Sequence, residues 1–229
     1  MAFFKTSNAQ EDVKDVVGGA YINSSDMYDV EIVAGFMDKN DKGARVISLL
    51  VNHNGTEQPL FAAFRLDNND GTPNFESQMF NKFLIVCGVD ELDEPQEAYL
   101  PIGKNKSDRE TLIFPELEGI NVTLRIVMEY GMYNGKVQER KKIKGAYNID
   151  TKATASEIVN NAEPGQQYEK DLEYANKTIY KDDLDEETIK NWIDAGRPET
   201  LDGAKGGSTG NAKPDKPKFG SKTSKFAKK

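Results

Sequence analysis

The sequence predicts a mainly β protein, a five-stranded Greek-key barrel with one helix between its third and fourth strands. Two observations lead to this fold class. Five segments alternate apolar and polar residues, as strands do, and one segment has the three-and-four spacing of a helix. The segments follow one another as strand, strand, strand, helix, strand, strand. That is the element order of an OB-fold, although other small barrels share a five-strand pattern.

The first three strands are expected within residues 28–66. One face of residues 28–37 carries alternate, mostly apolar side chains: Tyr28, Val30, Ile32, Ala34 and Phe36. Residues 46–51 are largely apolar on both faces, which indicates a strand that is buried on both sides or strongly curved. Asn54-Gly55 is a hairpin signal. The third strand, residues 60–66, places Phe61 and Arg65 on the face opposite Leu60 and Phe64.

The helix is expected in residues 74–91. Its apolar positions are Phe75, Met79, Phe83 and Val86, with Asn74 as the N-cap and Gly88 as the stop signal. Residues 92–118 are rich in Pro, Asp, Glu and Lys, and we expect a long loop there. Strands four and five follow at 120–130 and 136–149, joined by a turn at 131–135.

Three regions are expected along the chain: an OB-fold DNA-binding domain in residues 1–152, an acidic helical extension in 153–202 and a disordered tail containing Lys, Gly and Phe in 203–229. Within the extension, residues 154–163, 165–176 and 185–197 are expected to form short helices. The tail lacks the apolar residues needed to build a core.

Charge is distributed unevenly between these regions. The formal net charge is -8, but residues 163–202 hold five Lys/Arg against 12 Asp/Glu, and residues 203–229 hold eight Lys against one Asp. The average therefore conceals an acidic segment that is followed by a basic one.

Several classes of protein are disfavoured by the residues present. One cysteine, Cys87, excludes an intramolecular disulfide framework, and with one histidine, His53, it leaves no His/Cys metal-ligand set. Residues 131–136, GMYNGK, have three residues between the glycines, whereas a phosphate-binding loop has four. We expect neither an enzyme nor a cofactor or metal site. No apolar run is long enough to span a membrane, and we expect no secretory signal.

The last strand indicates nucleic-acid binding. Alternate residues on one face are almost all cations: Lys136, Gln138, Arg140, Lys142 and Lys144. Cations along a groove neutralise phosphates, and aromatic faces stack exposed bases. Arg45, Phe61, Arg65 and Arg125 lie on the less apolar faces of the other strands. Two alternatives remain open: a lysine-rich strand is often a solvated edge that discourages aggregation, and Tyr130 and Tyr133 can serve packing alone.

Two segments carry a resemblance to a known family. Residues 24–51, SSDMYDVEIVAGFMDKNDKGARVISLLV, and 122–148, VTLRIVMEYGMYNGKVQERKKIKGAYN, together with the acidic middle and the KPKFGSK unit, resemble bacteriophage single-stranded DNA-binding proteins of the OB-fold type. The resemblance implies a non-enzymatic protein that coats single strands during phage DNA replication or recombination, in the cytoplasm of the infected bacterial host. Many such proteins end in an acidic segment that recruits partners, whereas here the acidic part is internal.

The resemblance also implies roles for particular residues. The first hairpin would supply Lys39, Lys42 and Arg45 to a DNA-binding groove, the last strand would supply Arg140, Lys142 and Lys144, and Tyr133 and Phe61 would stack on bases. The complete set of candidate DNA-binding residues is Lys39, Lys42, Arg45, Phe61, Arg65, Arg125, Tyr130, Tyr133, Lys136, Arg140, Lys142 and Lys144. The second hypothesis is a protein-interaction module that docks on replication or recombination enzymes through residues 163–202 and the tail.

Overall fold

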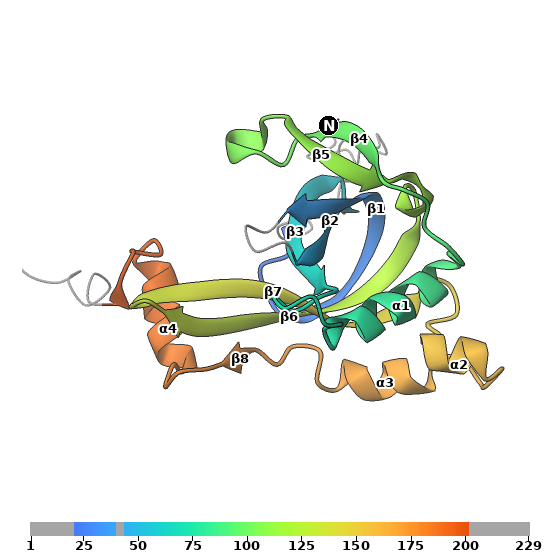
Figure 1. Ribbon diagram of the computed structural model, residues 1–229. Helices are drawn as coiled ribbons and strands as arrows, with labels where there is room; N and C mark the ends of the chain where they lie inside the picture. Colours follow the sequence, from blue (N-terminus) through green and yellow to red (C-terminus); the bar gives the residue numbers. More distant parts are fainter. Residues whose placement is uncertain (1–20, 40–43, 202–229) are drawn as a thin grey trace, which may run out of the picture.

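The computed structural model describes residues 21–39 and 44–201, and strands predominate in it (Figure 1). The prediction of a mainly β protein is confirmed. The strands are β1 Asp26–Lys39, β2 Arg45–His53, β3 Thr56–Arg65, β4 Gln96–Leu100, β5 Arg109–Phe114, β6 Asn121–Tyr133, β7 Lys136–Asn148 and β8 Ile179–Tyr180. The helices are α1 Glu76–Cys87, α2 Ala155–Val159, α3 Gln166–Leu172 and α4 Glu186–Asp194, with short 3-10 helices η1 Lys104–Lys106 and η2 Pro115–Leu117.

The strands form one open sheet that is antiparallel except between β6 and β8. Strand β1 pairs with β2 over most of its length, with β6 through residues 26–31 and with β5 through residues 35–37. The β6–β7 hairpin extends beyond this body (Figure 1). Strands β3 and β7 approach each other, but no ladder joins them among the described strands. The sheet is therefore open between β3 and β7.

Strand β1 changes its packing partners halfway along. A bulge between Ile32 and Ala34 shifts the register against β2. Ile32 packs in the main core, whereas Ala34 and Phe36 pack in a second cluster with Leu50 of β2. A bulge bends a strand and increases its twist, so one strand can contribute to both clusters.

Helix α1 closes the main core. Its buried side chains are Phe80, Phe83 and Val86, and the rings of Phe80 and Phe83 lie 5.2 and 5.1 Å from that of Phe64 on β3. Gly88 ends the helix in the left-handed conformation, as the sequence predicts. The prediction that Phe75 lies on the apolar face of the helix was wrong, because Phe75 precedes the first turn and is 78% exposed.

The expected long loop at residues 92–118 was also wrong. The segment contains the β4–β5 hairpin together with η1 and η2. Its composition is polar because only a few of its side chains are buried, among them Leu100, Phe114 and Leu117. Strand β5 pairs with the second half of β1. Its formation therefore depends on a segment that is distant in the sequence, and its own residues alternate only weakly.

The acidic extension packs along the β6–β7 hairpin (Figure 1). Ile189 and Trp192 of α4 are buried against Met128, Tyr130 and Val137. The predicted helices of the extension are confirmed with narrower bounds. The predicted disordered tail lies outside the described residues. Within residues 21–39 and 44–201, no helix is both long and apolar enough to cross a membrane.

Gly35 provides a test of the bend in β1. A Cβ atom at this position would lie 2.3 Å from Cδ1 of Leu117, whose side chain is fully buried. We expect Gly35→Ala to lower the free energy of unfolding by about 1–3 kcal/mol, because the core must shift to admit the methyl group. Urea denaturation followed by circular dichroism measures this change. An unchanged midpoint would show that β1 does not depend on this close approach.

Candidate nucleic-acid interface

A cleft of about 890 Å³ lies where β3 and β7 fail to pair. Strand β3 forms one wall and residues 139–142 of β7 form the other. Asn74, just before α1, and Glu76 of α1 also line the cleft. Segments that are far apart in the sequence therefore meet along one opening. Its lining is mixed, with aromatic, cationic and anionic side chains.

The edge of β3 explains why the sheet stays open at this point. Pro59 has no backbone N–H to donate to a neighbouring strand. Within sheets, proline is therefore confined to edge strands, to the first residue of a strand and to bulges. Further along, residues 61–63 oppose Ser48 alone, and Ala62 has a φ of 49°, in the left-handed region. This conformation costs a residue with a Cβ atom about 1–2 kcal/mol. The Ser48 hydroxyl oxygen accepts a hydrogen bond from the Ala62 amide at 3.0 Å, which holds the bulge.

The bulge presents Phe61 to solvent. Its side chain lines the cleft and is 47% exposed. One contact orients the ring, an edge-on approach to Phe36 with the centroids 6.3 Å apart. An aromatic side chain that is held in place but half-exposed can stack on a flat ligand without first rearranging.

Four cations line the cleft: Arg65, Arg140, Lys141 and Lys142. The Arg65 guanidinium donates to the Asp67 backbone carbonyl oxygen and the Asn69 amide oxygen, which are both neutral acceptors. Arg140 is exposed and forms no ion pair within the described part of the chain. Lys141 is partly buried, and this desolvation lowers its pKa. An approaching anion would favour its charged form.

Both carboxylates of the cleft are neutralised. Glu76 pairs with Lys142 at 3.0 Å and also accepts the backbone N–H of Arg65. Glu139 pairs with Arg197, which follows α4, at 2.9 Å. Arg65, Arg140 and Lys141 thus remain without a carboxylate partner among residues 21–39 and 44–201. The cleft therefore favours an anion locally, although the whole chain is acidic.

The structure brings together four of the sequence-predicted residues: Phe61, Arg65, Arg140 and Lys142. Other predicted residues lie outside the cleft lining. Arg45 forms a two-pronged ion pair with Asp67, with one contact of 2.6 Å, and the bond from Arg45 lowers the pKa of the Asp67 carboxyl. Lys144 is exposed on β7. The side chain of Lys39 and the whole of Lys42 lie outside the described residues.

The tip of the β6–β7 hairpin holds two more predicted residues. Tyr133 is 64% exposed there and faces Lys136 across the hairpin. Lys136 forms an exposed ion pair with Glu199. Exposed pairs of this kind contribute little to stability. Neither residue lines the cleft, and whether they contact DNA stays a prediction.

The side chains of the two predicted residues on β6 contact the extension. Arg125 donates to the Asp171 carboxylate of α3 at 3.2 Å and to the Tyr174 carbonyl oxygen at 3.3 Å. Tyr130 is 4% exposed, with its ring stacked on Tyr180, and burial raises its pKa to about 12. The structure does not bring these residues to the cleft. Whether they contact DNA stays a prediction, because alternation identifies a face of a strand but not what covers that face.

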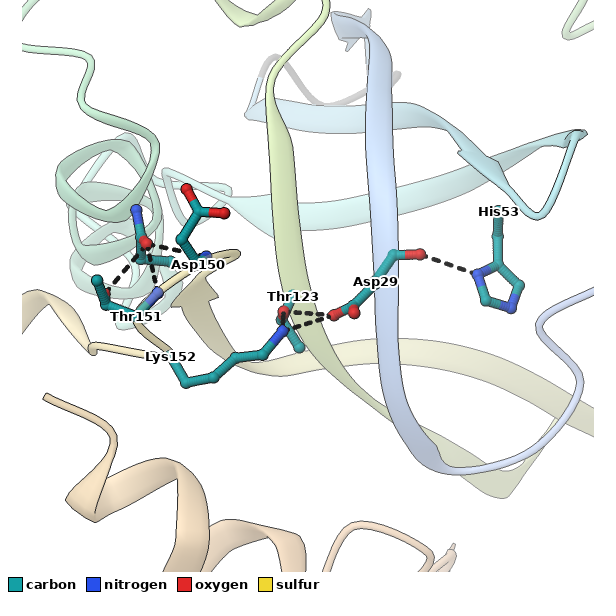
Figure 2. Close-up of polar contacts among 7 residues, drawn as sticks. Asp29, His53, Thr123, Asp150, Thr151 and Lys152 are labelled. Carbon is teal, nitrogen blue, oxygen red and sulfur yellow. Dashed lines mark hydrogen bonds and ion pairs between the residues drawn. The ribbon is translucent and has the colours of Figure 1, made fainter.

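A second polar cluster joins Asp29, Thr123 and Lys152. The buried Thr123 hydroxyl donates to Asp29 at 2.5 Å and accepts from Lys152 at 2.7 Å (Figure 2). His53 contacts the backbone carbonyl oxygen of Asp29 at 2.9 Å, not its carboxylate. The cluster ties β1, β6 and the turn after β7 together. Within the described ranges, no group of three or more His, Cys, Asp or Glu residues could hold a metal ion.

Sequence reasoning missed two features of the cleft. Lys141 is not among the residues predicted from the sequence, yet it lines the cleft beside Arg140. The bulge at Ala62 was not foreseen either. Pro59 was the available signal, since a proline within a strand pattern marks an edge.

Neither protein-family models nor curated proteins match the chain. The geometry of the cleft therefore carries the functional argument.

Asp171 provides a test of how the extension is held. Its carboxylate accepts from Arg125 and, at 2.6 Å, from the hydroxyl of the buried Tyr147. We expect Asp171→Ala to lower the free energy of unfolding by about 1–3 kcal/mol, because two largely buried donors lose their acceptor. Urea denaturation followed by Trp192 fluorescence measures the loss. Glu173→Ala, an exposed change on the same helix end, is the matched control, and an equal effect of both variants would refute this role.

Proposed function

We propose that this protein binds single-stranded DNA without sequence preference in the cleft between β3 and β7, and that it acts by binding and not by catalysis. One observation carries the proposal. The cleft combines an exposed, oriented Phe61 with three cations that have no carboxylate partner in the described chain, while both of its carboxylates are neutralised. Phosphate neutralisation and base stacking need these two kinds of group.

The aromatic side chain favours single strands over duplex DNA. In a duplex the base faces are stacked on one another, so a phenylalanine reaches them only after unstacking. In a single strand the faces are free, and stacking on an aromatic side chain does not depend on the base. The cations add an attraction that is independent of sequence.

We further propose that the sheet is a variant of the OB-fold barrel. Three features support this interpretation: the β1–β2–β3 meander, the position of α1 before β6 and β7, and the approach of β3 to β7. The β4–β5 hairpin is then an insertion before the fourth barrel strand. OB-folds bind oligonucleotides on the face of their second and third strands, and here Val46 of β2 lines the cleft together with Pro59, Phe61, Ala62 and Arg65 of β3.

The biological setting in this proposal comes from the resemblance to phage proteins. Coating of single strands during phage DNA replication or recombination, in the cytoplasm of the infected bacterium, agrees with a cleft that binds DNA irrespective of sequence. The proposal requires no cofactor.

A titration tests the proposal directly. Fluorescence anisotropy with labelled oligo-dT should give a Kd of roughly 10⁻⁴–10⁻⁶ M or tighter at physiological salt. The logarithm of the association constant should fall with the logarithm of salt concentration with a slope of about -2, if three cations each contact one phosphate of a single strand. Competition with duplex DNA and RNA defines the preference. Absence of binding at about 100 µM protein in low salt would refute the proposal.

Two substitutions separate the two kinds of contact. Phe61→Ala should weaken binding by about 1–3 kcal/mol without changing the salt slope, because stacking releases no counterions. Arg140→Ala should weaken binding and reduce the steepness of the slope by about 0.7. Tyr99→Ala removes an exposed aromatic residue on β4 and serves as the control for Phe61. Arg125→Ala should cost stability but not affinity. Equal loss of affinity in Arg125→Ala and Arg140→Ala would contradict the assignment to the cleft.

A second candidate function is a module that docks on replication or recombination proteins. Exposed apolar side chains on the extension favour it: Ile158, Val159, Leu172 and Tyr174. The buried Trp192 does not, because α4 uses its apolar face to pack on the β6–β7 hairpin. The same titration distinguishes the two functions, since a module of this kind has no need to bind the oligonucleotide.

A further inference from the structure

The turn after α4 holds an arginine in an unusual conformation. Gly196 and Arg197 both have positive φ angles, 81° and 57°. The Gly196 amide donates to the Ile193 carbonyl oxygen, and the Arg197 amide donates to that of Trp192, both at 2.9 Å. Glycine suits such a turn, but a residue with a Cβ atom is disfavoured in the left-handed region. The strain at Arg197 calls for a compensating interaction.

The side chain of Arg197 supplies that interaction. Its Nε atom donates to Oε2 of Glu139 at 2.9 Å, and its guanidinium lies 5.9 Å from the centre of the Trp192 ring. Trp192 is fixed in turn by a hydrogen bond from Nε1 to the Pro198 carbonyl oxygen at 2.8 Å. The turn is thus built so that the arginine reaches β7.

Glu139 is two residues from Lys141, and both line the cleft. Residues two apart on a strand lie on the same face. Lys141 has no ion-pair partner in residues 21–39 and 44–201, whereas Glu139 is held by Arg197. Their electrostatic effects on Lys141 are opposed: Glu139 stabilises its charged form and Arg197 destabilises it. In the absence of Arg197, Glu139 could pair with Lys141, which lies on the same face of β7.

We propose that Arg197 is a positioning residue of the cleft: by holding Glu139, it keeps the Lys141 ammonium group available for a phosphate of the bound strand. The part of the inference that concerns phosphate rests on the proposed function. The restraint of Glu139 does not. The extension is therefore a working part of the site, although Arg197 itself does not line the cleft.

A double-mutant series tests this role. Arg197→Ala should weaken oligo-dT binding roughly three- to tenfold, as for the loss of one charge-assisted contact. It should also make the salt slope shallower by about 0.7, because one phosphate contact is lost. Adding Glu139→Gln should restore both quantities, since the amide cannot neutralise Lys141. Lys190→Ala, an exposed change on α4, removes one positive charge and is the matched control. Circular dichroism checks the folding of each variant.

A second readout works without DNA. Competitive acetylation followed by mass spectrometry reports the reactivity of Lys141. Pairing with Glu139 raises a lysine pKa and slows acylation, so Arg197→Ala should react more slowly at Lys141, and Glu139→Gln should reverse the change. Unchanged reactivity, or failure of Glu139→Gln to rescue, would overturn the inference. If the wild-type protein does not bind oligo-dT but Lys141 responds as expected, the proposed function fails and the restraint of Glu139 stands.

Discussion

The bend in β1 is the constraint on which the rest of the structure depends. One strand pairs with β6 through its first half and with β5 through its second, while β2 follows it along most of its length. The bulge at Ile32–Ala34 makes this possible, and Gly35 leaves room for Leu117 of η2 to fill the core at the bend. Because β6 is held by the first half of β1, the β6–β7 hairpin comes round towards β3 and the cleft forms between them.

Local pairing, and not total charge, decides where the molecule can attract an anion. The formal net charge is -8, yet the cleft keeps cations free because its carboxylates are already occupied. Lys142, a phosphate ligand in the sequence-based prediction, pairs with Glu76 and neutralises it. Arg45 is likewise occupied, by Asp67. Ion pairs of this kind shape the electrostatic potential of the surface around them.

The extension is joined to the sheet by apolar and polar contacts together. Trp192 buries its ring against the β6–β7 hairpin, and β8 adds a short parallel pairing to β6. Lys181 pairs with the buried Glu129 of β6 at 2.8 Å, and this ion pair neutralises the buried carboxylate. Asp171 likewise forms an ion pair with Arg125 of β6. Charged residues of the extension therefore neutralise opposite charges on β6.

The sequence by itself determined the five long strands, α1, the end of α1 at Gly88 and the amphipathic α4, because alternation and helical spacing are local consequences of backbone geometry. It also placed Phe61 and Arg65 away from the core. Only the tertiary structure decided that residues 92–118 hold a hairpin, that Phe75 is exposed, and that Arg125 is covered while Arg140 is free. The physical reason is that strand pairing, burial and ion pairing depend on which distant segments meet, and periodicity carries no information about that partner.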